Sequence, residues 1–182
     1  MIVCAGESEQ IGDAIPIGIG MVDAAIRLTE LCLKDKPNEL IFVGTAGSYG
    51  YAKLFDVMVS SSAVNIENSS LSGDSYTPIE SIVSHETSKN TLIVNSSNYI
   101  TTNADISKQY IDRGVDLENM EFYAIAKVAQ RFSIPFRGIF CVTNYCDENA
   151  HSDFIKNRSK AMEILTKKLK RLDNEKDITR LY

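Results

Sequence analysis

Apolar runs alternate along this chain with segments whose apolar residues recur at helical spacing. Runs bounded by glycine or polar residues predict buried strands at residues 1–6, 14–20, 39–50, 56–64, 91–100 and 134–144. Helical spacing predicts helices at residues 21–36, 105–111, 121–132 and 152–172. Within residues 39–50, the apolar strand is expected to run into a glycine-rich loop, GTAGS, at residues 44–48.

The helix at residues 21–36 is expected to cover a sheet with one apolar face. That face consists of Val22, Ala25, Ile26, Leu31 and Leu33. Strands that alternate with helices predict an α/β fold, a three-layer α/β/α sandwich with a mixed, largely parallel central sheet. A chain of 182 residues is long enough for one buried core, so residues 1–182 are expected to form a single domain.

Composition narrows the partners that the chain can have. Hydrophobic residues make up 44% and charged residues 24%, which is typical of a globular protein. A net charge of -5 argues against nucleic-acid binding, and the basic cluster at residues 167–171 is expected to be a solvated helix face. The sequence has neither a membrane-length apolar run nor a leader-like beginning, which predicts a cytoplasmic protein with no membrane contact.

No cofactor or metal is expected. The four cysteines are scattered, without a CxxC pair, and are predicted to be reduced thiols. Cys146, Asp147 and His151 match no common zinc spacing. The turn GIGMVD has Asp23 where a dinucleotide-binding turn needs its third glycine.

Polar residues follow the predicted strands at residues 5–9, 44–48, 95–99 and 143–145. The carboxyl ends of parallel strands meet at one edge of a sheet, so a site is expected there. In GTAGS, the backbone N–H groups of Ala46 and Gly47 can face a phosphate oxygen, a water or ribose hydroxyls, or the segment can be a plain tight turn.

Glu121 is the strongest local signal of a binding site in the sequence. It lies between Met120 and Phe122 at the start of an apolar helix, where burying a carboxylate without hydrogen-bond donors is costly. The vicinal hydroxyls of a ribose supply two such donors. The alternative is an ordinary first-turn residue that the helix dipole stabilises.

Six segments together resemble the nucleoside phosphorylase superfamily, most closely its methylthioadenosine/adenosylhomocysteine nucleosidase and futalosine hydrolase branches. They are CAGESE (4–9), GIGMVDAAI (18–26), FVGTAGS (42–48), LIVNSSNYI (92–100), ENMEFYAIAKVAQRFSIPF (118–136) and CVTNYCDENA (141–150). Each segment is a weak signal, whereas their order and spacing are fairly specific.

At the sugar end, the resemblance implies that Glu9 positions or deprotonates the attacking water, with Glu7 as its possible replacement. Both could instead be turn carboxylates that face solvent. The resemblance places Thr45 beside the ribose and the nucleophile, Met120 against the sugar, and Glu121 on the 2′ and 3′ hydroxyls.

At the base end, Tyr99 and Ile100 match the position where the family stacks an aromatic ring on the purine and reads its edge with backbone groups. Tyr99 could equally be a core aromatic. Asn144 stands where adenine-cleaving members carry an acid. A neutral amide cannot deliver a proton but can pair with a 6-oxopurine, which favours that substrate over adenine. A structural Asn that closes a turn is the alternative.

The sequence departs from the family pattern at two further places, and both concern the nucleophile. Phe42 stands in the stretch where phosphorylases of the family carry an arginine, so water is favoured over phosphate. Only residues 10–13 remain where the nucleosidases have a longer stretch. The part of the site that is expected to position the attacking water is therefore shortened.

The expected function is a purine nucleosidase that cleaves the N-glycosidic bond of a 6-oxopurine nucleoside with water. A purine nucleoside phosphorylase and a non-catalytic purine-nucleoside binder are the alternatives. By resemblance, the protein is expected to form a homodimer or a higher homo-oligomer.

Overall fold

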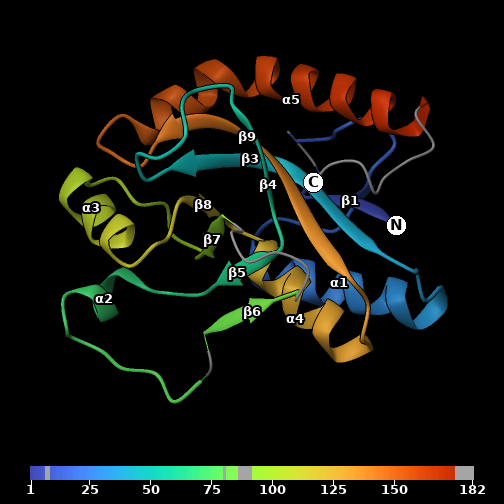
Figure 1. The fold of residues 1–182 in the computed structure, drawn as a ribbon, viewed down its shortest axis with the longest axis horizontal. Helices are drawn as coiled ribbons and strands as arrows, with labels where there is room; N and C mark the ends of the chain where they lie inside the picture. The colour runs from blue at the N-terminus through green and yellow to red at the C-terminus, as the bar shows by residue number, and fades with distance from the viewer. Residues whose placement is uncertain (7–8, 80, 86–91, 175–182) are drawn as a thin grey trace.

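The structure is a computed structural model that describes residues 1–6, 9–79, 81–85 and 92–174. Its core is one mixed sheet with helices on both faces (Figure 1). The strands are β1 (Ile2–Cys4), β2 (Ile15–Pro16), β3 (Leu40–Ser48), β4 (Val57–Ser60), β5 (Ser62–Val64), β6 (Ile82–Ser84), β7 (Ile93–Ser96), β8 (Leu117–Asn119) and β9 (Phe136–Tyr145). The helices are α1 (Gly20–Lys34), α2 (Asn68–Leu71), α3 (Ala104–Asp112), α4 (Phe122–Phe132) and α5 (Ala150–Asn174).

The long strands β3 and β9 run parallel through the centre of the sheet. On its other edge, β3 pairs with β1 near its start and with β8 near its end. The pairs β1–β2, β5–β7 and β7–β8 are also parallel, whereas β3–β8, β4–β9 and β5–β6 are antiparallel. The prediction of a mixed, largely parallel sheet is therefore confirmed.

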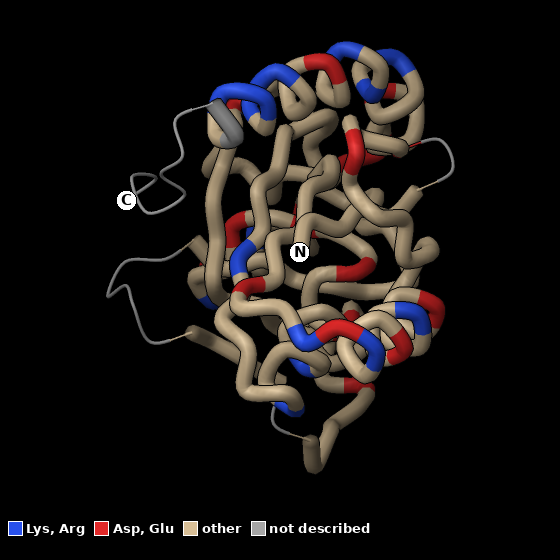
Figure 2. Tube along the Cα trace, turned by 90° about the vertical axis from the view of Figure 1, so that its right-hand side faces the viewer, with Lys and Arg blue, Asp and Glu red and all other residues tan. Residues whose placement is uncertain are grey.

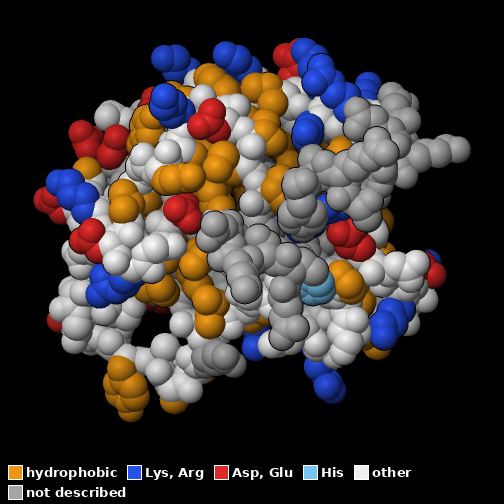
Figure 3. All heavy atoms as spheres, viewed as in Figure 1, with side chains coloured by type: hydrophobic (Ala, Val, Ile, Leu, Met, Phe, Trp, Pro, Cys, Tyr) orange, Lys and Arg blue, Asp and Glu red, His pale blue; other side chains and the backbone are white. Residues whose placement is uncertain are grey.

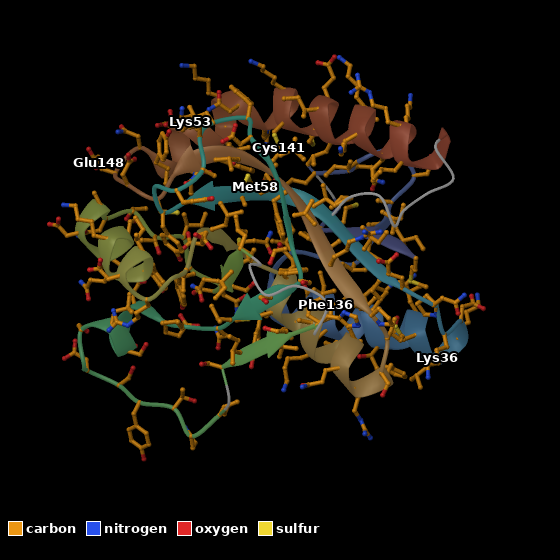
Figure 4. All side chains as sticks on the ribbon, in the orientation of Figure 1. Lys36, Lys53, Met58, Phe136, Cys141 and Glu148 are labelled. Atoms are coloured by element: carbon orange, nitrogen blue, oxygen red, sulfur yellow. The ribbon has the colours of Figure 1, made fainter. Side chains whose placement is uncertain are left out.

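The helices form two layers, one on each side of the sheet (Figure 1). On one side, Ala161, Leu165 and Leu169 of α5 are buried against the sheet in one apolar cluster. On the other side, α4 buries the apolar face expected from the sequence and packs against α1. The strand β9 passes between the layers: Phe136 lies beside α4, and Cys141, farther along, lies beneath α5 (Figure 4).

Charged residues occur on the helices of both layers (Figure 2). Lys and Arg positions recur along the outer surface of α5, and Asp or Glu positions also occur on segments between the helical layers (Figure 2). The basic cluster at 167–171 lies on this helix, and Lys and Arg side chains gather along the α5 edge of the surface (Figure 3). Within the described residues, no helix is both long and apolar enough to cross a membrane.

The apolar face predicted for α1 is correct only in part: Ala25 and Leu31 pack against the apolar core, whereas Val22, Ile26 and Leu33 are exposed. Its buried residues are Gly20, Ala24, Leu28 and Cys32, a line of i, i+4 positions, whereas Val22 is 63% and Leu33 is 73% exposed. Helical periodicity predicts that the helix has an apolar face. It does not predict which of two overlapping apolar stripes packs against the rest of the protein. Ala24, Leu28 and Cys32 are the residues of α1 that are buried in the apolar core.

Three strand predictions also need correction. GTAGS is not a loop: residues 44–48 continue β3 alongside β9, with a register shift between Ala46 and Gly47. The strand expected at 56–64 divides at Ser61 into β4, which pairs with β9, and β5, which pairs with β6 and β7. The strand β8 was not expected, because three residues between two helices are too few for an alternating pattern.

Candidate active site

A cavity of about 210 Å³ opens where β3, β8 and β9 end. Eight residues expected at a site from the sequence line it. They are Glu9, Thr45, Ala46, Gly47, Ile100, Met120, Glu121 and Asn144. Residues far apart in the sequence meet here because β3 and β9 run parallel and β8 pairs with the end of β3.

Glu121 is buried, with 3% of its surface exposed, and faces this cavity. Its Oε1 accepts a hydrogen bond from the backbone N–H of Gly20 at 2.8 Å, and its Oε2 accepts one from Asn119 Nδ2 at 2.9 Å. Burial raises the pKa of Glu121 to about 7, and the nearby charge of Glu9 contributes to the rise, although both donors oppose it. A carboxylate oxygen accepts more than one hydrogen bond, so both oxygens keep capacity for a ligand.

Asn119 positions Glu121 and was not singled out from the sequence. Its Oδ1 accepts hydrogen bonds from the backbone N–H groups of Glu121 and Phe122, both at 2.8 Å, at the beginning of α4. This is the contact that a capping side chain makes with the unpaired N–H groups of a first helical turn. The signal available in the sequence was an Asn just before an apolar helix.

Glu9 lines the same cavity. Thr45 Oγ1 donates a hydrogen bond to Glu9 Oε1, and the Glu9 backbone N–H bonds to the carbonyl oxygen of Gly6 at 2.9 Å. Burial raises the pKa of Glu9, while the bond from Thr45 and the charge of Arg158 oppose the rise. The short stretch at 10–13 therefore still brings Glu9 to the cavity, and Glu7, its expected replacement, lies outside the described residues.

Asn144, on β9, also lines the cavity. Its Oδ1 accepts a hydrogen bond from Thr143 Oγ1 at 2.9 Å, and its Nδ2 donates one to the carbonyl oxygen of Tyr145 at 3.1 Å. The second hydrogen on Nδ2 is left for a ligand.

Tyr99 does not line the cavity, and its side chain is 78% exposed. The expectation that its ring faces the purine site is not met in this structure. The backbone N–H of Tyr99 bonds to Ser97 Oγ at 3.1 Å, and the N–H of Thr101 bonds to Glu118 Oε1 at 2.9 Å. These bonds hold the segment so that Ile100, not Tyr99, faces the cavity.

The aromatic ring that does line the cavity is Phe154, from α5. From the sequence it was only one residue of the helix expected at 152–172, and the docking of α5 across β9 brings it to the site. Glu118, on β8, also lines the cavity and was not expected there. The signal available in the sequence was a carboxylate directly after the apolar Leu117.

The cavity can hold a small, partly polar molecule. It is lined by carboxylates and amides together with apolar or small side chains, including Ala5, Ile19 and Met120. This combination of an apolar lining with a few converging polar groups is typical of a small-molecule site. Within the described residues, no group of His, Cys, Asp and Glu side chains is arranged to bind a metal ion.

Comparison with solved structures gives the same fold. A futalosine hydrolase mutant from Helicobacter pylori has 18% identity and a TM-score of 0.79, covering 96% of this chain and 97% of that chain. The D198N mutant of the H. pylori MTAN, with 5′-methylthioadenosine in its active site, has 20% identity and a TM-score of 0.76, with coverage of 89% and 79%. A putative 5′-methylthioadenosine/S-adenosylhomocysteine nucleosidase from Borrelia burgdorferi, bound to adenine, has 16% identity and a TM-score of 0.75, with coverage of 95% and 98%.

At the level of sequence, a search of curated proteins found no match. The profile of the phosphorylase superfamily matches residues 2–96 and 90–172, nearly the whole described chain. Together with the mixed sheet and its flanking helices, this match identifies the chain as a member of the phosphorylase superfamily.

Proposed function

We propose that this protein is a purine nucleosidase, which cleaves the bond between C1′ of the ribose and N9 of the base with water. The observation that carries the proposal is the buried Glu121, which shares one cavity with the Glu9–Thr45 pair and with Asn144. This arrangement supplies a separate group for the sugar, the water and the base.

Glu121 binds the sugar. A ribose 2′,3′-diol offers two O–H donors, and each oxygen of Glu121 has one protein donor and room for another. Met120 packs its apolar side chain against the ribose ring. Because the cavity excludes water from this carboxylate, the hydroxyl groups replace the hydration that burial removed.

Glu9 activates the nucleophile. As the C1′–N9 bond breaks, the ribose becomes oxocarbenium-like, and a water oxygen forms the new bond to C1′. The proton that this water loses passes to Glu9, whose raised pKa makes it a better base than an exposed carboxylate. Thr45 holds Glu9 in place, and the electron pair of the broken bond leaves with the base.

Asn144 binds the departing base and favours a 6-oxopurine. Its free Nδ2 hydrogen can be donated to N7 or O6, and Phe154 supplies an apolar ring at the cavity wall. The similar structures that hold 5′-methylthioadenosine or adenine support a purine nucleoside as the class of substrate.

Water is favoured over phosphate because no Lys or Arg is among the described residues that line the cavity. The test is incubation with inosine, with and without phosphate, followed by detection of ribose and ribose 1-phosphate. Phosphate-independent release of ribose is expected. Turnover that requires phosphate would identify a phosphorylase, and thermal stabilisation by inosine without any product would identify a non-catalytic binder.

We also propose that the protein is a homodimer in the cytoplasm. Val22, Ile26 and Leu33 are exposed on α1 beside an apolar groove between α1 and α4. Light scattering at micromolar concentration is expected to give twice the chain mass, and a monomeric mass would contradict this. The four free, buried cysteines support a reducing compartment.

A further inference from the structure

Arg158 lies one helical turn after Phe154 on α5, and the Phe154 ring lines the cavity. Residues four apart on a helix are neighbours on one face, and the guanidinium carbon of Arg158 lies 6.0 Å from the centre of the Phe154 ring. Arg158 is partly buried and is not among the residues that line the cavity. Its guanidinium group therefore lies beside the cavity wall and not in the cavity itself.

Asn157 fixes this part of α5 to a central strand. Its side chain is buried, and its Nδ2 donates a hydrogen bond to the carbonyl oxygen of Thr143 on β9 at 2.8 Å. Thr143 lines the cavity, so this bond joins the helix to the strand at the site. Because Asn157 and Arg158 are consecutive, the same bond holds the backbone of Arg158 close to the cavity.

The positive charge of Arg158 acts on Glu9, which lines the same cavity as Phe154. Burial raises the pKa of Glu9, and the charge of Arg158 and the hydrogen bond from Thr45 oppose the rise. Among the described residues, no carboxylate forms a direct ion pair with Arg158. No closer partner in this part of the chain therefore neutralises the charge that Glu9 experiences.

The other titratable groups that the described residues place around Glu9 are acids. Glu118 and Glu121 line the same cavity, and the charge of Glu9 contributes to the raised pKa of Glu121. Burial raises the pKa of the Cys4 thiol on β1, and the charge of Glu9 adds to that rise. An ionised Glu9 thus adds negative charge to a cavity that must also hold an ionised Glu121. A nearby cation offsets the repulsion between them.

We propose that Arg158 is a positioning residue for the nucleophile: its charge keeps Glu9 ionised, so that Glu9 can accept the proton of the attacking water while Glu121 holds the ribose. This inference rests on the proposed function and adds a residue to the water-activating part of the site. Because Arg158 does not line the cavity, it acts through Glu9 and not on the nucleoside.

The first measurement is the titration of the Glu9 carboxyl in the free protein by 13C NMR, with its signal assigned by the loss of that signal in Glu9→Gln. Arg158→Met removes the charge and keeps an unbranched side chain against Phe154. The midpoint of the Glu9 titration is expected to rise by at least about 0.5 pH unit, because a neighbouring cation favours the ionised carboxylate. Arg158→Lys keeps a positive charge and is expected to restore at least about half of this change.

The matched control is Lys156→Met, which removes one positive charge from the same helix. Lys156 is exposed and lies two residues before Arg158, so it is on a different face of α5. The net charge of the protein changes equally in the two variants. Solvent and salt screen an exposed charge, so the Glu9 midpoint is expected to stay within about 0.1 pH unit of the wild type.

The second measurement is kcat at saturating inosine from pH 5 to 8. In this complex the ribose hydroxyls hold Glu121 ionised, so the fall of kcat at acid pH reports the protonation of Glu9. Arg158→Met is expected to move this fall to higher pH, with a plateau within about threefold of the wild type. A purely structural role for Arg158 predicts a lower melting temperature and a lower plateau, with the pH of the fall unchanged.

An unchanged Glu9 midpoint in folded Arg158→Met would overturn the proposal, and so would an equal change in Lys156→Met. If Arg158→Met does not fold, Arg158→Gln takes its place in both measurements. A wild type that releases no ribose, together with a shifted Glu9 midpoint in the variant, is a different result. The proposed function then fails, while the effect of the Arg158 charge on Glu9 stands.

Discussion

Asn119 Nδ2 donates a hydrogen bond to Glu121 Oε2 at 2.9 Å while Asn119 Oδ1 accepts from the Glu121 backbone N–H at 2.8 Å. One side chain thus holds both the backbone and the carboxylate of the residue that we propose binds the sugar. A variant of Asn119 that keeps the side-chain oxygen and loses the NH2 group would remove the contact with the carboxylate and leave the contact with the backbone.

Asn119→Asp is expected to weaken inosine binding about tenfold while the protein stays folded. An aspartate still accepts from the first N–H groups of α4, because Asp caps helices as well as Asn does. It removes the donor to Glu121 and places a like charge beside it. Calorimetric titration with inosine measures the change.

The control for this variant is Asn103→Asp. Asn103 also caps a helix, since its Oδ1 accepts from the backbone N–H groups of Asp105 and Ile106 at the beginning of α3. It is not among the residues that line the cavity. Equal affinity loss in both variants would show that the effect is not local to Glu121.

Inosine affinity is expected to rise with pH up to about 7, where the Glu121 pKa lies in the free protein. Ribose hydroxyls donate to the ionised carboxylate, so binding below this pH must release the proton from Glu121. Calorimetry in buffers of different ionisation enthalpy measures that release. Affinity that stays flat from pH 5 to 8 would mean that Glu121 is already ionised throughout.

The free energy of unfolding is expected to fall as pH rises from about 4.5 to 7. The carboxyl of Glu121 has a pKa of about 7 in the folded protein and near 4.3 in an unfolded chain. Between these values the folded state binds more protons than the unfolded state, so raising the pH favours unfolding, by roughly 4 kcal/mol once the pH is above both values.

Glu121→Gln isolates this effect, because it keeps the size of the side chain and cannot titrate. Urea unfolding at pH 5 and pH 7.5 is expected to show a smaller fall for the variant than for the wild type. If the free energy of unfolding falls equally in the two proteins, the fall comes from other buried carboxyls, such as Glu9.

Asn144→Asp is expected to increase hydrolysis of adenosine relative to inosine. The aspartic acid can donate a proton to N7 of the departing base, and a positioned general acid commonly contributes about 10²-fold or more to the rate. The measurement is kcat/KM for both nucleosides across pH 5 to 8. If adenosine hydrolysis does not improve at the acid end of this range, the base does not lie against position 144.

Which residues could be predicted depended on whether a local pattern specified their surroundings. The apolar face of α4 and the buried strands β3 and β9 followed from patterns within single segments, because burial on one or both faces imposes a fixed periodicity. The face of α1 followed only in part, since two apolar stripes overlap and the packing of the helix buries the one that contains Ala24, Leu28 and Cys32.

The side chains around the cavity also divide into those that a local segment predicted and those that it did not. The resemblance of short segments to a family identified Glu9, Thr45, Glu121 and Asn144, and the structure brings them to one cavity. It also named Tyr99, whose direction depends on the hydrogen bonds that the backbone N–H groups of Tyr99 and Thr101 donate to Ser97 Oγ and Glu118 Oε1. The bond to Glu118 joins two segments that no local pattern connects.

The sequence by itself determined the α/β class, the family, and the segments whose polar residues follow buried strands. Only the tertiary structure decided that Ile100 rather than Tyr99 faces the cavity, that Phe154 reaches it from α5, and that Glu118 lies across Gly47 from Asn144. The physical reason is that periodicity and turn chemistry act within a few residues, whereas the register between β3, β8 and β9 is fixed by long-range packing.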